Sequence, residues 1–181
     1  MTRDDALKLV TEQVSNKNLV KHMLAAEAVM RRLARHFGED EDLWGLAGLI
    51  HDLDYDQTVN DFKNHGMVTA TMLEGRDVPE AVVYAVKSHP GHFPRISRMD
   101  QALYAADQVT GLIVAAALMH PSKQLKNVDI DFIERRFTEK RFAAGANRDQ
   151  IKSCEAFGLA LHDFLVLSLE GMKSIDRALG L

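Results

Sequence analysis

The sequence predicts an all-α fold. Only 4 prolines and 11 glycines occur in its 181 residues, and the apolar residues mostly recur at intervals of three and four, the spacing that gathers them on one face of a helix. No segment requires the alternating pattern of a β-strand. With 46% hydrophobic and 27% charged residues, the composition is typical of a globular domain. We therefore expect a single domain over residues 1–181.

Start and stop signals delimit the predicted helices. The first carries an apolar stripe and ends at Gly38. Pro79 suits the first turn of a later helix, and Pro121 ends a segment that is too evenly hydrophobic to lie on the surface. Asn147 followed by Gln150 is a capping-box pattern that begins the last helix. The predicted helices are, in chain order, 17–37, about 40–52, about 65–74, 79–88, 99–120, 129–137 and 147–172.

Charge and cysteine content narrow the class of protein. The net charge of −4 gives no basic footprint, so we expect no nucleic acid polymer among the partners. The only cysteine, Cys154, allows no intrachain disulfide and no thiolate metal cluster, which suits a cytoplasmic protein. The N-terminal residues lack the apolar core of a secretory signal, and the longest apolar run, 112–119, is far shorter than the ~20 residues of a membrane span. We expect no membrane partner, and oligomerisation is left open.

The most informative segment is Gly48–Asp56, in which an apolar helix runs into the pair His51-Asp52 and then into further carboxylates. Neighbouring residues on a helix point about 100° apart, so His51 and Asp52 can share one ion only where the helix ends or lines a cavity. Burying an imidazole and a carboxylate without partners is costly, which favours a metal ion or a salt bridge. Taken alone, however, the pair fits a capping aspartate beside a core histidine better.

Three further histidines and one aspartate elsewhere in the sequence favour a metal site over this interpretation. His22 lies on the apolar stripe of the first helix, and His65 begins the helix that follows the polar, turn-rich segment 53–64. His89 closes the next helix, and Asp107 interrupts the apolar segment 99–120. Each histidine alone fits a core or capping role, but an aspartate in the middle of an apolar helix nearly always answers a cation or several donors. Together these residues predict one convergent site.

The sequence resembles the HD superfamily of metal-dependent phosphohydrolases, whose signature is found here as His22 … His51-Asp52 … Asp107. The match covers about residues 17–111 and leaves a C-terminal helical extension, 122–181. The whole sequence looks closest to small bacterial HDIG-type proteins. The resemblance implies an HD-domain helical bundle with additional C-terminal helices.

Two further histidines extend the resemblance. His65 and His89 sit where two-metal members, such as the HD-GYP phosphodiesterases and the bacterial diadenosine tetraphosphate hydrolases, carry additional ligands. The sequence also departs from these relatives. No Gly-Tyr-Pro segment follows His89, and Asp54-Tyr55-Asp56 stands where some relatives place a lysine. Hydrolysis of cyclic di-GMP is therefore not implied.

The resemblance implies a metal site with His22, His51, Asp52 and Asp107 for a first ion and His65 and His89 for a second. Asp52 would bridge the two. Imidazole and carboxylate ligands suit one or two divalent transition-metal ions, Fe, Mn, Co, Ni or Zn, better than calcium. Such ions lower the pKa of a water that can attack phosphorus in line.

Asp52 and Asp54 are the candidate catalytic carboxylates. Asp54 would take a proton from the nucleophile or orient water, although a solvated acidic loop is the slightly favoured interpretation. Arg95 and Arg98, in the loop after His89, could bind substrate phosphate through paired N–H groups, with surface solvation as the equal alternative. Lys123 is a weaker candidate for the same role.

These residues predict a phosphatase or phosphodiesterase. Its substrate would be a phosphate ester or anhydride of a phosphorylated, nucleotide-like small molecule. The alternatives are an HD-derived metal-binding sensor or regulatory module without hydrolysis, and a di-iron oxygenase-like enzyme. Because a binding relic would not need every ligand of two ions, the complete set favours hydrolysis.

Overall fold

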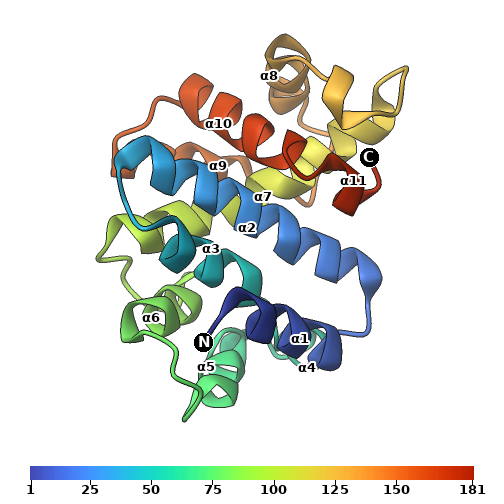
Figure 1. Ribbon diagram of the computed structural model, residues 1–181. Helices are drawn as coiled ribbons and strands as arrows, with labels where there is room; N and C mark the ends of the chain where they lie inside the picture. Colours follow the sequence, from blue (N-terminus) through green and yellow to red (C-terminus); the bar gives the residue numbers. More distant parts are fainter.

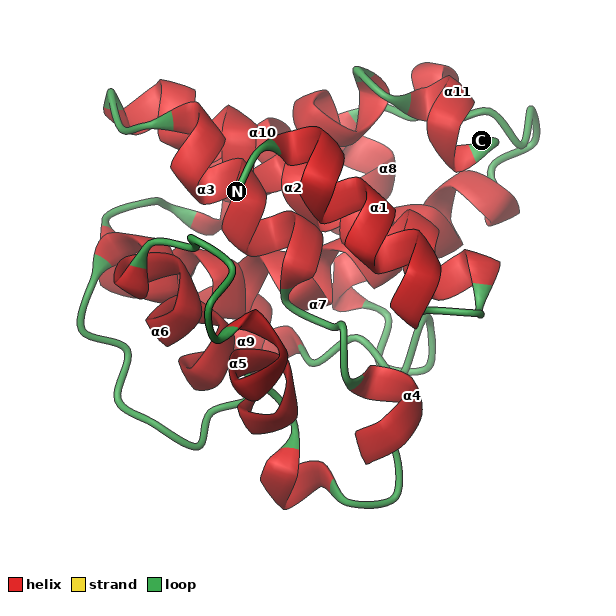
Figure 2. Ribbon diagram, turned by 60° about the horizontal axis from the view of Figure 1, so that its bottom comes forward, coloured by secondary structure: helices red, strands yellow, loops and turns green.

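The computed structural model describes residues 1–181, and Figure 1 shows a bundle of helices. Figure 2 shows the same chain without a strand, which confirms the predicted all-α class. The helices are α1 Arg3–Gln13, α2 Lys17–Phe37, α3 Glu41–Ile50, α4 Tyr55–Thr58, α5 Met67–Leu73, α6 Glu80–Ser88, α7 Arg98–Met119, α8 Ile130–Thr138, α9 Arg148–Lys152, α10 Leu161–Lys173 and α11 Asp176–Leu179. The 3₁₀ turns are η1 Phe62–Asn64, η2 Leu125–Asn127 and η3 Ser153–Phe157.

Helix α2 runs through the middle of the molecule and packs against α3, α7 and α10 (Figure 1). Two glycines allow this close packing. A methyl group on Gly48 of α3 would lie 2.7 Å from the carbonyl oxygen of Ala26, and one on Gly171 of α10 would lie 2.7 Å from that of Ala28. Only glycine lets the backbones approach this closely. The packing at Gly48 brings the end of α3 against α2.

Helix α7 is the core helix that the apolar segment 99–120 predicts. It packs against α2, α8, α9 and α10, and its buried face includes Leu103, Ala106 and Ile113. By length and composition alone α7 could also cross a membrane. Its most apolar stretch is 56% buried among the other helices, as expected for the central helix of a bundle.

Helix α1 lies outside the helices predicted from the sequence. Its apolar residues are few, but it begins with a reciprocal cap. The Thr2 hydroxyl accepts from the Asp5 amide and the Asp5 carboxylate accepts from the Thr2 amide, each at 3.2 Å. Ala6, Leu9 and Val10 are buried on the side that packs against α3. The cap, rather than a long apolar stripe, was the readable signal.

Two predicted helix boundaries are wrong, and a glycine explains each. The segment 147–172 is not one helix, because the chain reverses at Gly158, whose φ of +91° ends η3 before α10 begins. The helix predicted from about His65 begins at Met67, because Gly66 takes a φ of +79°. His65 therefore lies in the connection that precedes α5.

Candidate metal centre

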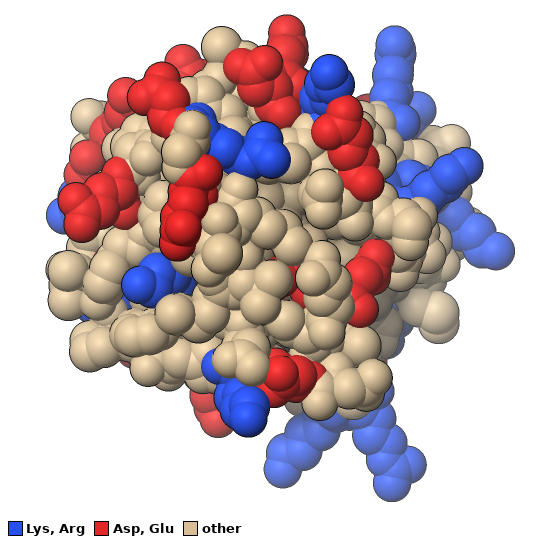
Figure 3. Space-filling view, turned by 90° about the horizontal axis from the view of Figure 1, so that it is seen from below, with Lys and Arg blue, Asp and Glu red and all other residues tan.

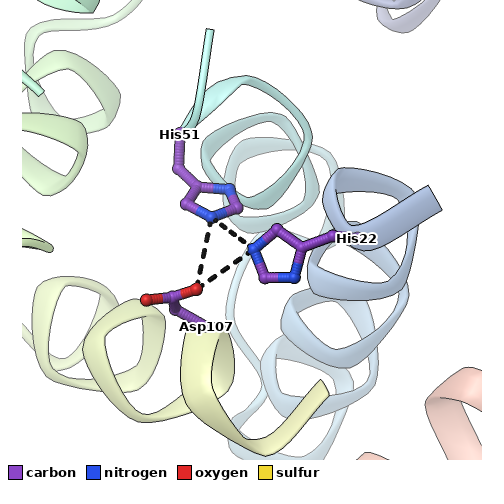
Figure 4. A group of neighbouring side chains, drawn as sticks. All are labelled: His22, His51 and Asp107. Atoms are coloured by element: carbon purple, nitrogen blue, oxygen red, sulfur yellow. Dashed lines mark hydrogen bonds and ion pairs between the residues drawn. The ribbon is translucent and has the colours of Figure 1, made fainter. Parts of the chain in front are cut away.

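Three of the predicted ligands meet between helices. Figure 4 shows the side chains of His22 from α2, His51 at the end of α3 and Asp107 from α7 pointing toward one another. The Nε2 atoms of His22 and His51 are 3.1 Å apart. The Asp107 Oδ1 atom lies 3.1 Å from His22 Nε2 and 3.7 Å from His51 Nε2. The structure therefore brings together residues far apart in sequence, as predicted.

A second group lies beside the first and shares Asp52 with it. The Nε2 atoms of His65 and His89 are 3.1 Å apart, and Asp52 Oδ1 lies 3.2 Å and 3.4 Å from them. Asp52 Oδ1 is also 3.5 Å from His51 Nε2, and Asp52 Oδ2 is 3.5 Å from His22 Nε2. The Asp52 carboxylate thus lies between two pairs of imidazoles, where the sequence predicts a bridging ligand.

Backbone carbonyls fix the orientation of two imidazoles. The Nδ1 atom of His51 donates to the Gly48 carbonyl oxygen at 2.8 Å, and that of His89 donates to the Val86 carbonyl oxygen at 2.6 Å. A carbonyl can only accept, so each Nδ1 carries the proton in the neutral ring and each Nε2 presents a lone pair. Both His51 and His89 are buried. Their positions at helix ends let Nδ1 reach the carbonyl three residues back.

A threonine orients His22 in the same sense. The Thr110 hydroxyl donates to the Asp107 carbonyl oxygen at 2.8 Å, so its oxygen accepts from His22 Nδ1 at 3.0 Å. His22 Nε2 therefore also presents a lone pair, 3.1 Å from the lone pair of His51 Nε2. Two lone pairs at this distance repel unless a proton or a metal ion lies between them. The donor set, imidazole nitrogens with carboxylate oxygens, is the one that divalent transition metals prefer, and the residues fit such ions.

Asp54 is buried with 0% exposure, so the interpretation as a solvated loop residue is wrong. Its Oδ1 accepts from His65 Nδ1 at 2.8 Å, and its Oδ2 accepts from the amides of Gly66 at 2.8 Å and Thr69 at 2.9 Å. Both oxygens are engaged in hydrogen bonds that hold His65 and the start of α5, so we expect Asp54 to position His65 rather than to take a proton from the nucleophile. Burial raises its pKa, but the hydrogen bonds from His65 and the two amides outweigh burial and lower it.

The electrostatics show how strongly this site favours positive charge. Burial alone would lower the pKa of His51, but the carboxylates of Asp52 and Asp107 outweigh it and raise that pKa to about 9. Burial also opposes protonation of His65, yet its contacts with Asp52 and Asp54 raise its pKa to about 9. The pKa of Asp52 lies well below its usual range despite burial. Protons and metal ions would therefore compete for the same atoms.

The two groups open into a cavity of about 710 Å³. No lysine or arginine lines it. Its lining residues are Asn16, Leu19, His22, Asp52, Tyr55, Thr58, Val59, Phe62, His65, His89, Pro90, Asp107, Gln108, Gly111, Ala115, Ala143, Gly145, Ala146 and Gln150. A phosphate bound there would meet no lysine or arginine of the chain, which favours a metal ion as the source of positive charge.

The predicted phosphate-binding residues do not line this cavity. The Arg98 guanidinium pairs with Glu39 at 3.2 Å and stacks over the Phe37 ring, and the Arg95 guanidinium lies 3.9 Å from the centre of the Tyr104 ring. Lys123 is exposed in the turn after α7. Aromatic and acidic neighbours hold both arginine side chains outside the cavity lining, so the structure does not bring the expected arginine clamp to the site.

Gln108 is a site residue that the sequence analysis missed. Its Nε2 donates to Asp107 Oδ2 at 2.8 Å, and its Oε1 accepts from the Asn147 amide at 3.0 Å. It therefore fixes the carboxylate oxygen that faces away from His22 and ties it to the chain before α9. The position directly after Asp107 was the only available signal. Through this link the C-terminal segment 143–150 forms one wall of the cavity.

Comparison with known proteins identifies the family to which this fold and site belong. The family model described as HD domain matches residues 19–112, and the chain belongs to this family of the metal-dependent phosphohydrolase superfamily. Ribonuclease Y from Desulfotalea psychrophila (strain LSv54 / DSM 12343) is 24% identical over 166 residues, 90% of this chain and 32% of that protein. Ribonuclease Y from Sulfurovum sp. (strain NBC37-1) is 25% identical over 162 residues, 88% of this chain and 32% of that protein. The chain thus spans about a third of the length of these curated relatives, and no solved structure matches it.

Proposed function

We propose that the chain is a phosphohydrolase that cleaves a phosphate ester or anhydride of a nucleotide-like small molecule. The observation that carries this proposal is the Asp52 carboxylate lying between two histidine pairs at the wall of a cavity that no lysine or arginine lines. His22, His51 and Asp107 would hold one divalent ion with Asp52, and the pair formed by His65 and His89 would hold the other with the same carboxylate.

Charge decides what such a site can bind. The Asp52 and Asp107 carboxylates give the cavity negative charge, and no lysine or arginine in its lining offsets that charge. A pair of divalent ions would supply what the cavity lacks, positive charge for phosphoryl oxygens and a lowered pKa for an attacking water. The residues around the ligands keep the atoms in place: Asp54 holds His65, and Gln108 holds Asp107. This support is typical of metal centres.

The size of the cavity favours a small substrate. A volume of about 710 Å³ lies within the range of roughly 300–1,000 Å³ of small-molecule sites. On the face seen in Figure 3, lysine and arginine side chains stand in separate groups with acidic residues among them. The net charge is −4. These features favour a confined phosphate compound over a long polyanion, which would need a continuous basic surface.

RNA is the second candidate substrate, and the comparison favours it. Both relatives described above carry the name Ribonuclease Y, which runs counter to the expectation that no nucleic acid polymer is a partner. The same metal and carboxylate groups would serve a phosphodiester bond in RNA. The two candidates differ in whether contacts extend beyond the cavity, so only RNA turnover should fall steeply as salt rises.

The test is turnover by the full chain after loading with Mn²⁺, Fe²⁺, Co²⁺, Ni²⁺ or Zn²⁺, in air and without oxygen. The panel contains nucleoside mono-, di- and triphosphates, cyclic nucleotides, dinucleoside polyphosphates and short RNA. We expect metal-dependent release of phosphate or nucleotide from a small compound in both atmospheres, and its loss in Asp52→Asn. Asp56→Asn is the matched control, since Asp56 is exposed and lies outside the cavity lining. Metal binding without turnover would favour a sensor, and turnover only in air would favour an oxygenase.

A further inference from the structure

One wall of the cavity carries large apolar side chains that the bundle leaves exposed. Tyr55, Val59 and Phe62 are exposed by 42%, 57% and 59%, and all of them line the cavity. The other exposed large hydrophobic residues, Ile96, Leu118 and Met119, do not line it. Exposing apolar surface has a free-energy cost. Exposure of this kind at a cavity mouth points to a ligand with an apolar face.

The two aromatic rings stand next to the histidine groups. The Tyr55 ring packs edge-on against the His65 ring with centroids 5.7 Å apart, and the Phe62 ring lies 5.8 Å from the same ring. The Phe62 ring also lies near the His92 ring, with centroids 5.1 Å apart, and His92 Nε2 donates to the Phe62 carbonyl oxygen at 2.7 Å. This aromatic wall is therefore continuous with the site proposed for the phosphate and is anchored at η1.

The part of the lining contributed by α7 and the segment before α9 is of a different kind. Small residues line it, among them Gly111, Ala115 and Gly145, and they leave room beside α7 and the segment before α9. The Gln150 side chain lines the cavity and has no hydrogen-bond partner within the chain. The Asn16 side-chain oxygen caps α2, which leaves its amide N–H groups free. Such amides can pair with the nitrogen and oxygen atoms at the edge of a planar heterocycle.

We propose that Tyr55 and Phe62 form a stacking surface for the nucleobase of the substrate, with Asn16 and Gln150 facing the edge of the base. The substrate class would then be nucleoside phosphates rather than sugar or alkyl phosphates. This inference rests on the proposed function for the position of the phosphate. Stacking on an aromatic ring tolerates every base, because each base has a π-face. The site therefore selects a nucleobase without strict selection among bases.

The test measures binding, so that it does not depend on turnover. Calorimetry on the Mn²⁺-loaded full chain compares the phosphonate analogue of adenosine monophosphate with that of ribose phosphate. We expect the nucleoside analogue to bind about 10- to 100-fold more tightly, and Phe62→Ala to remove most of that preference. Tyr55→Leu keeps apolar bulk but loses the aromatic ring, so this variant should lose part of the preference for the nucleoside analogue. Ile96→Ala, at a residue 74% exposed outside the cavity, should leave both affinities unchanged.

The outcomes separate this inference from the proposed function. Equal affinities of the two analogues for the parent protein, or a preference that survives in both Phe62→Ala and Tyr55→Leu, would overturn the stacking surface. A nucleobase preference in a protein that hydrolyses no phosphate compound would support the stacking surface and count against the hydrolase. Turnover of ribose phosphate and adenosine monophosphate at equal kcat/KM would support the hydrolase and count against the stacking surface. Circular dichroism of each variant shows that the helices are intact.

Discussion

The two halves of the candidate metal centre are built in different ways. His22 and Asp107 belong to α2 and α7, helices of 21 and 22 residues in the core of the bundle. His65 and His89 flank α5 and α6, which have 7 and 9 residues. Helix packing places the first group, whereas buried hydrogen bonds place the His65 ring. The first half should therefore respond to changes in packing, and the second to changes in single polar groups.

The largest expected effect is on the first half, from Gly48→Ala. The added methyl would lie 2.7 Å from the Ala26 carbonyl oxygen, so α3 must move away from α2 and carry His51 away from His22. We expect a loss of about 1–3 kcal/mol in the free energy of unfolding, together with weaker metal binding. Denaturant titration measures the first and metal titration the second.

Gly111→Ala is the control for Gly48→Ala. Gly111 lies in α7 with nothing within 4 Å of an added methyl, so alanine should stabilise the helix by about 0.5–1 kcal/mol. Equal stability changes in the two variants would show that the contact between α2 and α3 does not depend on Gly48.

Asp54→Asn should affect the second half alone. The asparagine side chain cannot keep an acceptor on both His65 Nδ1 and the amides of Gly66 and Thr69. The His65 ring then loses its orientation, and affinity for the second ion should fall about 10–100-fold. Isothermal titration should resolve a weakened second step beside an unchanged first one. Asp56→Asn should change neither step, and equal weakening of both steps in Asp54→Asn would contradict the division into two halves.

The pH dependence of stability should have opposite signs with and without metal. The pKa values of His51 and His65 are raised to about 9, so in metal-free protein their stabilising contribution is complete below about pH 6.5 and is lost as the pH rises through 9. Metal ions replace those protons, so metal-dependent stabilisation should grow over the same range. Thermal melts at pH 6 and 9 should show the metal-induced rise in Tm increasing by several degrees. A rise in Tm that shrinks between these pH values would refute this competition.

The smallest expected effect comes from Gln108→Leu. The leucine side chain cannot replace the hydrogen bonds of the Gln108 amide, which join Nε2 to Asp107 Oδ2 at 2.8 Å and Oε1 to the Asn147 amide at 3.0 Å. Affinity for the first ion should drop only a few-fold, because Thr110 still orients His22. KM should rise more than kcat falls, since the segment 143–150 lines the cavity. Gln108→Glu keeps the acceptor for Asn147 and should restore KM but not metal affinity.

The fold class and the ligand positions could be predicted from the sequence because both leave local patterns in it. Apolar spacing marks α2, α3 and α7, and Asp107 stands out because a charge in an apolar helix needs a partner. The cap at Thr2 and the reversal at Gly158 are as local, but α1 and the break before α10 were still missed. The apolar spacing continues across Gly158 and hides the break before α10, whereas α1 carries too few apolar residues to show a stripe.

Side-chain partners over long sequence distances could not be predicted. Arg98 resembles a phosphate ligand in sequence, and its pairing with Glu39 emerges only from the fold. Asp54 looks like a loop carboxylate until Gly66 turns the chain and brings the amide of Thr69 to it. The C-terminal segment reaches the cavity because α9 packs against α7 and the Asn147 amide donates to Gln108. Such contacts are set by tertiary packing, which no local pattern records.

The central claim is that Asp52 joins two adjacent metal ions. Electron paramagnetic resonance of Mn²⁺-loaded protein, with metal content measured on the same sample, tests it most directly. We predict two ions per chain with an exchange-coupled spectrum, as expected for ions about 3.5–4 Å apart, and loss of the coupling in Asp52→Asn. A single uncoupled ion per chain, or a coupled spectrum that Asp52→Asn leaves unchanged, would contradict the account.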